Sequence, residues 1–359
     1  MEMKYIKTVM IAAMAAAMTF TSCSDDENGP EICPPGNAAS GLFIVNEGNF
    51  GYSNASISYY DPENKTVENE IFARANDMKL GDVAQSMTIH GDNAWIVVNG
   101  SHVIYAIDKN TYKEKGRIEN MGSPRYIHFL SDSKAYVTQL YDNRIYIINP
   151  STYSITGYIT IPDVSEAQGT TDMMVQDGKY VYCNCWSYQN CILKIDTTTD
   201  QVVDKLTVGV QPTSLVIDHN KKMWTVTDGG WEGNPFGYEA PSLWRIDVAS
   251  FKVEAHWDFT MGSYPSELQI DGTGNYIYWL NGDKVFKMDV NGSAMPADAF
   301  INGNGTYFYG LTVNPDNGEV YVADAIDYQQ AGLISRYTAL GELIDSFYAG
   351  IIPGSFCWK

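Results

Sequence analysis

The segment Val103-Ile104-Tyr105-Ala106-Ile107-Asp108 decides how this chain folds. Its β-branched and aromatic residues end on an acidic residue, and a polar turn with a second β-rich run follows. Such residues favour strands, and two runs separated by a short polar turn indicate a pair of antiparallel strands. The segment therefore predicts the repeating unit of a β-sheet protein.

The same pattern occurs seven times along the chain. Its last residues are at positions 61, 108, 149, 196, 247, 289 and 338, between 41 and 51 residues apart, and the seventh run ends on Thr338 rather than on Asp or Asn. This interval is close to the period of a four-stranded propeller blade. The sequence predicts an all-β fold over residues 41–359, a seven-bladed β-propeller of four-stranded blades.

The first blade lacks one strand in the sequence. Residues 41–77 supply three strands, from Leu42 to Val45, from Ser56 to Asp61 and from Val67 to Phe72, but no innermost strand precedes them. Other innermost strands follow a proline, at Pro124, Pro212 and Pro265, and the last residues of the chain, 353–358, have the same form. We expect this C-terminal strand to close the ring, because closure removes the free sheet edges.

Residues 1–22 have the features of a processing segment. Lys4 and Lys7 precede an apolar run, residues 9–20, that is too short to span a bilayer, and small residues stand before Cys23. This arrangement resembles a bacterial lipoprotein signal, in which the cysteine is acylated and becomes the N-terminus. The alternative is a buried helix that contains a cysteine by chance.

The residues from Cys23 onward predict where the propeller is displayed. Ser24-Asp25-Asp26-Glu27 resembles the acidic signal that sends some lipoproteins to the outside of the outer membrane, although a solvated tether would also be acidic. Residues 23–40, rich in Pro and Gly, are expected to form a polar linker. We therefore expect an outer-membrane protein on the extracellular face, attached to the membrane through its lipid only.

The charge of the chain limits its partners. Residues 1–22 carry a net charge of +1, so their removal changes the net charge from −20 to −21. Nucleic acids and anionic membrane surfaces require a basic patch on the protein that binds them. We expect neither as a partner.

The cysteines allow more than one interpretation. Apart from the lipidated residue there are five, and Cys185 and Cys191 flank a five-residue turn between two predicted strands. Opposing Cβ atoms there come close enough for a disulfide, and buried free thiols are the alternative. Cys33 and Cys357 are a weaker candidate pair. A zinc site formed by Cys183, Cys185 and Cys191 would lack a fourth ligand.

Catalytic motifs are scarce. Gly51-Tyr52-Ser53-Asn54-Ala55 approaches a nucleophile elbow, but it lacks the last glycine and lies between two predicted strands. No phosphate loop or dinucleotide fingerprint is present. The histidines have no metal-ligand spacing and are His90, His102, His128, His219 and His256. We expect a protein that is not an enzyme and uses no cofactor or metal.

The loops on one face of the predicted propeller combine aromatic rings, Asn and Gln amides, and glycines. Aromatic rings give flat apolar contacts and amides both donate and accept hydrogen bonds, which suits a large neutral ligand with a planar ring. The alternative is that the rings pack between blades. The candidate ligand-binding residues are Asn49, Phe50, Arg125, Gln168, Trp186, Tyr188, Trp231, Phe236, Tyr238, Tyr307, Tyr309 and Tyr328.

Three segments carry a resemblance to a known family. Residues 41–51, which include Asn46-Glu47-Gly48-Asn49, together with residues 54–61 and 80–87, resemble the BtuG-like surface lipoproteins, which bind vitamin B12 and cap the outer-membrane transporter BtuB. More broadly, residues 41–359 resemble YncE-like and YVTN-type propellers. The blades of that group carry the phrase Ile-Asp-x-x-Thr, as in residues 195–199 here.

The resemblance implies capture of cobalamin or a related corrinoid and its transfer to a BtuB-like TonB-dependent transporter. Loop amides would bond the amide side chains of the corrin, and aromatic rings would cover the macrocycle. Two other functions stay open. One is a propeller that binds a glycan or another surface protein, and the more remote one is a hydrolytic propeller of the lactonase type.

Overall fold

The computed structural model describes residues 41–162, residue 164 and residues 170–359. The predicted signal segment, residues 1–22, and the linker, residues 23–40 with Cys23 and Cys33, lie outside the described residues, as does Gln168. None of the helices within the described part is long and apolar enough to cross a membrane.

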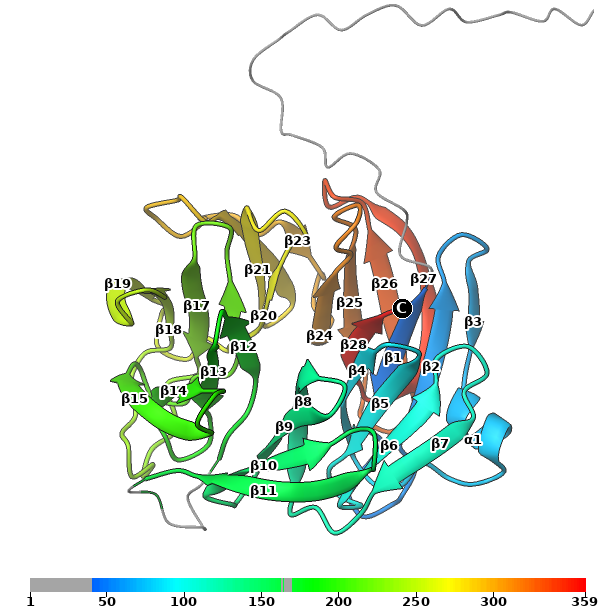
Figure 1. The fold of residues 1–359 in the computed structure, drawn as a ribbon. Helices are drawn as coiled ribbons and strands as arrows, with labels where there is room; N and C mark the ends of the chain where they lie inside the picture. Colours follow the sequence, from blue (N-terminus) through cyan, green and yellow to red (C-terminus); the bar gives the residue numbers. More distant parts are fainter. Residues whose placement is uncertain (1–40, 163, 165–169) are drawn as a thin grey trace, which may run out of the picture. The chain divides into compact units, whose positions relative to one another are not determined.

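Seven four-stranded antiparallel sheets form a ring of blades, which confirms the predicted propeller (Figure 1). We number the blades one to seven along the chain. Blade one contains β28 (Pro353–Trp358), β1 (Leu42–Asn46), β2 (Ser56–Asp61) and β3 (Thr66–Glu68). Blade two contains β4 (Ala84–His90), β5 (Asn93–Val98), β6 (Val103–Asp108) and β7 (Glu114–Ile118). Blade three contains β8 (Pro124–Ser131), β9 (Lys134–Gln139), β10 (Arg144–Asn149) and β11 (Ser154–Thr160).

The other four blades repeat this order from the innermost to the outermost strand. Blade four contains β12 (Met174–Asp177), β13 (Tyr180–Cys185), β14 (Cys191–Asp196) and β15 (Gln201–Thr207). Blade five contains β16 (Val216–Ile217), β17 (Lys222–Thr227), β18 (Ser242–Asp247) and β19 (Lys252–Asp258). Blade six contains β20 (Pro265–Ile270), β21 (Tyr276–Asn281), β22 (Lys284–Asp289) and β23 (Ile301–Asn302). Blade seven contains β24 (Phe308–Val313), β25 (Val320–Asp324), β26 (Ala331–Tyr337) and β27 (Leu343–Ile351).

The C-terminal strand closes the ring, as predicted. β28 pairs antiparallel with β1, with Leu42 opposite Trp358 and Ile44 opposite Phe356. In Figure 1 the red strand β28 lies beside the blue strand β1. Blade one is therefore built from both ends of the propeller, and β28 covers the edge that β1 would otherwise leave open.

The core lies between the blades. The second strands β5, β9, β13 and β17 are buried over their last five residues, because neighbouring blades cover both of their faces. Such strands show continuous apolar runs rather than alternation. Trp95, Trp224 and Trp279, one each in β5, β17 and β21, are among the largest fully buried side chains.

The residue that ends each repeat closes a tight turn. Oδ1 of Asp108 accepts hydrogen bonds from the backbone N–H groups of Asn110 and Thr111 at 3.0 and 2.9 Å. Similar bonds are made by Asp61, Asn149, Asp196, Asp247 and Asp289. Thr338, the exception in sequence, accepts two backbone N–H groups through Oγ1 at 3.2 and 3.1 Å. The repeat is therefore a turn motif that needs a side-chain acceptor.

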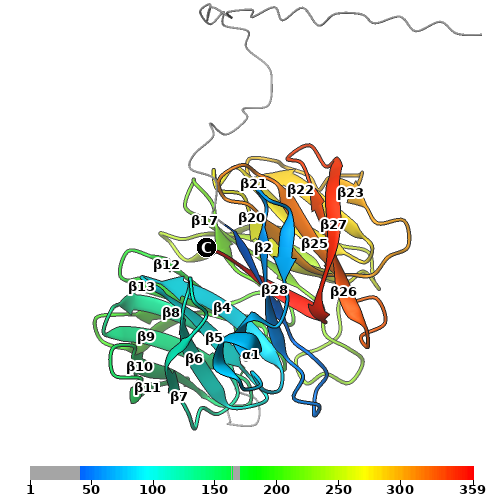
Figure 2. The same ribbon diagram turned by 90° about the vertical axis from the view of Figure 1, so that its right-hand side faces the viewer.

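One predicted strand is wrong in its second half. The run from Val67 to Phe72 is extended only to Glu68, and the short helix α1 (Ile71–Asn76) replaces the rest; Figure 2 shows it beside the second blade. Ile71 and Phe72 are both buried in the cluster between blades one and two. Adjacent residues of a strand point to opposite faces, so a helical turn is what brings both side chains into one cluster.

The cysteine register agrees with the predicted hairpin. Cys185 and Cys191 are direct partners across β13 and β14. Both are free buried thiols in the structure, which is the alternative stated above, and a disulfide between them stays a prediction. Cys183 and Cys357 are free as well. The proposed pair of Cys357 with Cys33 involves a residue outside the described part.

Candidate functional site

The innermost strands turn selected side chains towards the axis of the ring. In β4, β8, β20 and β24 the register with the next strand shifts near the first residues. Such bulges change the direction of side chains that would otherwise point alternately to the two faces of the sheet. Gln85, Arg125, Glu267 and Tyr309 lie at these four shifts, and all four line one cavity.

This cavity, which we call the axial cavity, has a volume of about 890 Å³. Six innermost strands and the segment before β16 contribute to its wall. Its aromatic lining includes three tyrosines with large exposed fractions, Tyr264 at 69%, Tyr307 at 59% and Tyr328 at 39%. The rings of Tyr309 and Tyr328 meet edge to face with centroids 5.7 Å apart. The cavity thus combines exposed rings with a buried polar interior.

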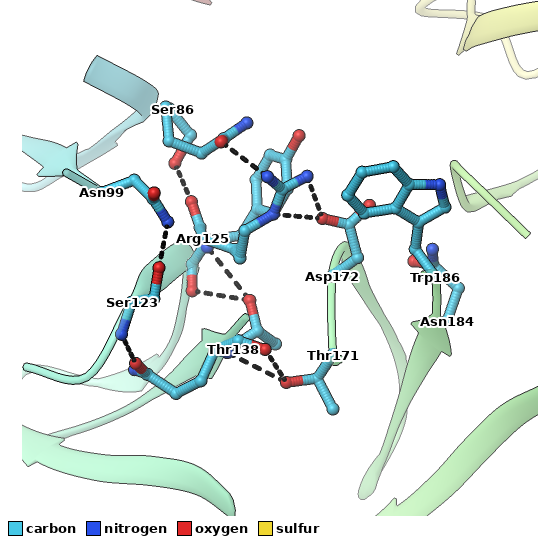
Figure 3. A network of polar contacts seen from close by, with 12 residues as sticks. Ser86, Asn99, Ser123, Arg125, Thr138, Thr171, Asp172, Asn184 and Trp186 are labelled. Carbon is cyan, nitrogen blue, oxygen red and sulfur yellow. Dashed lines mark hydrogen bonds and ion pairs between the residues drawn. The ribbon is translucent and has the colours of Figure 1, made fainter. Parts of the chain in front are cut away.

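Arg125 is the centre of the polar interior (Figure 3). Its Nε donates to Oδ1 of Asp172 at 2.9 Å and its Nη1 donates to Oε1 of Gln85 at 2.8 Å. Its Nη2 forms an ion pair with the same Asp172 oxygen at 2.9 Å. The guanidinium carbon lies 5.1 Å from the ring centroid of Trp186, a cation–π distance. All three nitrogens of the guanidinium group therefore have partners within the protein.

Trp186 is fixed from its other side by Asp228. The indole Nε1 donates to Oδ2 of Asp228 at 3.3 Å, and Gln211 and the backbone N–H of Gly230 donate to the same carboxylate at 2.9 and 2.8 Å. Burial raises the pKa of Asp228 in spite of these donors. The aromatic ring in the wall is therefore held in place before any ligand arrives.

Carboxyl groups dominate the rest of the interior. Glu47 accepts a hydrogen bond from the hydroxyl of Tyr309 at 3.0 Å, and burial raises the pKa of Glu47 to about 7. Burial, together with the neighbouring charges of Glu47 and Asp172, raises the pKa of Glu267 to about 8. Burial also raises the pKa of Asp172, although Arg125 opposes this effect. Several acids thus share one guanidinium group.

Glu267 is unusual in both backbone and side chain. Its φ of +52° lies in the left-handed region, which is rare and strained for a residue other than glycine. Its carboxylate makes no hydrogen bond or ion pair with the residues that the structure describes. A strained residue whose carboxylate faces a cavity without a protein donor is a candidate functional residue.

A smaller groove adjoins the axial cavity. It has a volume of about 240 Å³ and shares Asp228 and Tyr264 with the axial cavity. Its walls include the aromatic residues Trp231 and Tyr238. Tyr188 packs edge to face against Trp231 with ring centroids 5.2 Å apart.

The structure brings together some of the residues predicted from sequence and separates others. The predicted residues that line the axial cavity are Arg125, Trp186, Tyr307, Tyr309 and Tyr328, and those that line the groove are Trp231 and Tyr238. Phe50, 84% exposed, and Phe236 line neither. The amide of Asn49 bonds the backbone oxygen of Tyr328 instead of facing the cavity.

Sequence reasoning missed the acids and one amide: Glu47, Gln85, Asp172, Asp228 and Glu267. A signal for one of the missed positions, Glu267, was present, because the proline-led innermost strands repeat and the predicted residue Arg125 holds a similar place after its proline. Arg125 follows Pro124 directly and Glu267 follows Pro265 by two positions. Within the described residues no three His, Cys, Asp or Glu side chains are arranged to hold a metal ion.

Comparison with known proteins gives a family and a fold. Residues 40–348 match the family described as Domain of unknown function (DUF5074). A search of curated proteins found no match.

Solved structures of similar shape come from proteins with different activities. A quinonprotein alcohol dehydrogenase-like protein from Bacteroides thetaiotaomicron has a TM-score of 0.67 and 16% identity, over 89% of this chain and 78% of that chain. A periplasmic gluconolactonase from Pseudomonas aeruginosa has a TM-score of 0.65 and 12% identity, over 88% and 98%. Hydrazine synthase from Kuenenia stuttgartiensis has a TM-score of 0.61 and 17% identity, over 76% and 89%. At these identities the likeness concerns the propeller fold alone.

Proposed function

The chain belongs to the DUF5074 family, and we propose that it is a cell-surface binding lipoprotein that captures cobalamin or a related corrinoid in the axial cavity. The observation that carries this proposal is the composition of the cavity, which joins aromatic rings at exposed positions to a polar interior rich in hydrogen-bond acceptors. The family resemblance of residues 41–51 supports the choice of ligand.

The chemistry of a corrinoid matches this composition. A corrinoid is a large planar ring system that carries amide side chains. Tyr264, Tyr307 and Tyr328 offer ring surface for its apolar parts, and Glu47 and Glu267 offer acceptors for amide N–H groups. A volume of about 890 Å³ lies in the upper part of the range of ligand pockets.

The wall of the cavity is preorganised for such a ligand. Trp186 is held between the guanidinium group of Arg125 and the carboxylate of Asp228, so its ring loses little freedom when a ligand packs against it. Preorganisation of this kind raises affinity by lowering the entropy cost of binding.

A matched pair of tyrosines tests this site. Isothermal titration calorimetry with cyanocobalamin should give a Kd at least about tenfold higher for Tyr307→Ala than for the parent. Tyr348→Ala is the control, since Tyr348 has a similar exposed fraction, 57% against 59%, but lies on the outermost strand β27. Absence of cyanocobalamin binding by the parent, well above micromolar concentration, would refute the corrinoid proposal and favour a glycan or protein ligand.

The same proposal places the protein next to a BtuB-like TonB-dependent transporter on the extracellular face of the outer membrane. The lipoprotein-like signal before Cys23 and the acidic residues after it support this location. Cys23→Ala should leave the protein soluble, because one lost acylation site removes the anchor. Replacement of Asp25, Asp26 and Glu27 by Ala should retain the lipid but protect the protein from protease added to intact cells.

A second candidate function, a hydrolytic propeller of the lactonase type, is favoured by Glu47. A carboxyl group with a pKa of about 7 that accepts a hydrogen bond from Tyr309 in a cavity is suited to general acid–base catalysis at neutral pH. Hydrolysis of gluconolactone by the parent, lost in Glu47→Gln, would support this function. Equal rates for both proteins would refute it.

A further inference from the structure

Negative groups outnumber positive groups in the wall of the axial cavity. Four carboxyl groups line it, those of Glu47, Asp172, Asp228 and Glu267. Among the lining residues that the structure describes, Arg125 is the only Lys or Arg. His128 also lines the wall, but its imidazole carries little positive charge because burial lowers its pKa.

Arg125 already has an anionic partner, Asp172. Asp172 occupies two of its nitrogens and Gln85 the third, while Trp186 covers one face. A ligand carboxylate that bound Nε would have to displace Asp172, which is itself buried and would lose its ion pair. The two N–H groups that these contacts leave over belong to a cation whose charge Asp172 already balances. Breaking a buried ion pair costs more than one new contact returns.

Glu267 faces the cavity without a donor of its own. The charges around it are Glu47 from the loop after β1, Asp172 from the segment before β12, and Arg125 from β8. The hydroxyl of Tyr309 on β24, which faces the same cavity, donates to Glu47. Glu267 is half-buried in the cavity wall, and an acceptor without a protein donor is stabilised when a ligand supplies the missing N–H or O–H group.

From this arrangement we propose that the axial cavity selects its ligand by charge. It binds groups that donate hydrogen bonds, such as amides or ammonium groups, and rejects carboxylates of the same shape, and Glu267 is the residue that determines this specificity. The choice of corrinoid probes for the first test rests on the proposed function, but the charge selection does not depend on it.

The first test uses two corrinoids that differ in one group. Cyanocobalamin and its monocarboxylic acid derivatives, in which one propionamide is hydrolysed to propionate, have nearly the same shape. We compare the Kd of the tightest-binding acid derivative with the Kd of cyanocobalamin, and call the first divided by the second the Kd ratio. For the parent at pH 9, calorimetry should give a ratio of at least about ten. At pH 6 the ratio should be smaller, because protonation of Glu267 and Glu47 removes negative charge from the cavity.

Two variants identify the source of the discrimination. Glu267→Gln keeps the size of the side chain and should lower the ratio at pH 9 at least about threefold. Asp204→Asn removes the same charge from the exposed outermost strand β15 and should leave the ratio unchanged. A ratio near one in the parent at pH 9, or a ratio that is the same in Glu267→Gln, would overturn the proposal.

The second test needs no corrinoid and separates this inference from the proposed function. Benzamidinium and benzoate have the same ring and opposite charge. We expect millimolar benzamidinium to shift the NMR signal of the Trp186 indole N–H, and benzoate to leave it unchanged at pH 9. Equal shifts, or no shift with benzamidinium, would overturn charge selection, whereas failure of cyanocobalamin alone to bind would overturn only the corrinoid ligand.

Discussion

The acids at the blade turns and the acids in the axial cavity have opposite environments. Lys179 and the hydroxyl of Thr198 bond Asp196 and lower its pKa to about 2, and backbone N–H groups together with Lys115 hold the pKa of Asp108 well below its usual range. Glu47 and Glu267 have raised pKa values because burial removes water without enough donors in return. The turn acids stabilise the framework, whereas the axial acids lower its stability and are available to a ligand.

This difference separates the molecule into a framework and a site. In the framework, the side-chain acceptor that ends each repeat is bonded by backbone N–H groups of its own turn, and the same turn is made seven times. The site is assembled from residues of different blades, and among its described residues the carboxyl groups outnumber the Lys and Arg side chains. Natural proteins accept such local instability where binding or catalysis requires it.

The largest expected effect is on the framework. Deletion of residues 353–359 removes β28, opens blade one and exposes the edge of β1, so the domain should unfold or aggregate. Circular dichroism and size-exclusion chromatography would detect this. Removal of Lys359 alone is the control, since it follows the last strand and should leave the protein folded. A truncated protein that melts like the parent would contradict ring closure.

The second-largest expected effect is a loss of ligand binding at the site, with little change in the stability of the framework. Trp186→Ala removes the ring that Arg125 covers and should weaken ligand binding by about 2 kcal/mol, roughly thirtyfold in Kd. Its melting temperature should fall less than its affinity, because Trp186 follows the end of β13 and lies outside the clusters between blades. Calorimetry with cyanocobalamin and thermal denaturation measure the two quantities. A large loss of stability would show that Trp186 belongs to the framework.

The third effect concerns pH. Glu267 has a folded-state pKa of about 8, above the unfolded value of about 4.5, so the folded protein loses stability as pH rises from about 4.5 through 8. Glu267→Gln does not titrate and should be more stable than the parent. The gain should grow by on the order of 1–3 kcal/mol between pH 5 and pH 9. Urea denaturation at both pH values checks this, and a gain that is independent of pH would contradict it.

The fold could be predicted from sequence because its signal is local. Each turn needs a side-chain acceptor at a fixed place after an apolar run, and the repetition of this unit gives the number of blades. Even the exception, Thr338, keeps an oxygen at the required position. The strand expected up to Phe72 could not be corrected from sequence, because the burial of Ile71 and Phe72 in one cluster depends on the neighbouring blade.

The site could be predicted only in part. Aromatic residues in loops indicated Trp186, Tyr307 and Tyr328, but the same criterion selected Phe50 and Phe236, which line neither cavity. The acids were missed because they look like ordinary strand and turn residues. Glu267 lies at a register shift of an innermost strand, whereas Glu47, Asp172 and Asp228 lie in segments between strands that meet only where the blades converge. Neither feature is visible within one repeat.

The smallest expected effect distinguishes two versions of the same turn. Asp196→Ala should lower the melting temperature by about a few degrees at pH 7, because Lys179 and the backbone N–H of Thr198 lose their acceptor. Since the folded pKa of Asp196 is about 2, this stabilisation is present above the unfolded pKa of about 4 and is lost as pH falls through 2. Thr338→Val removes a neutral acceptor and should cost a similar or smaller amount at every pH. Melting temperatures at pH 7 and at the lowest pH where the parent folds would test both, and a pH-dependent loss in Thr338→Val would show that the turn does more than accept hydrogen bonds.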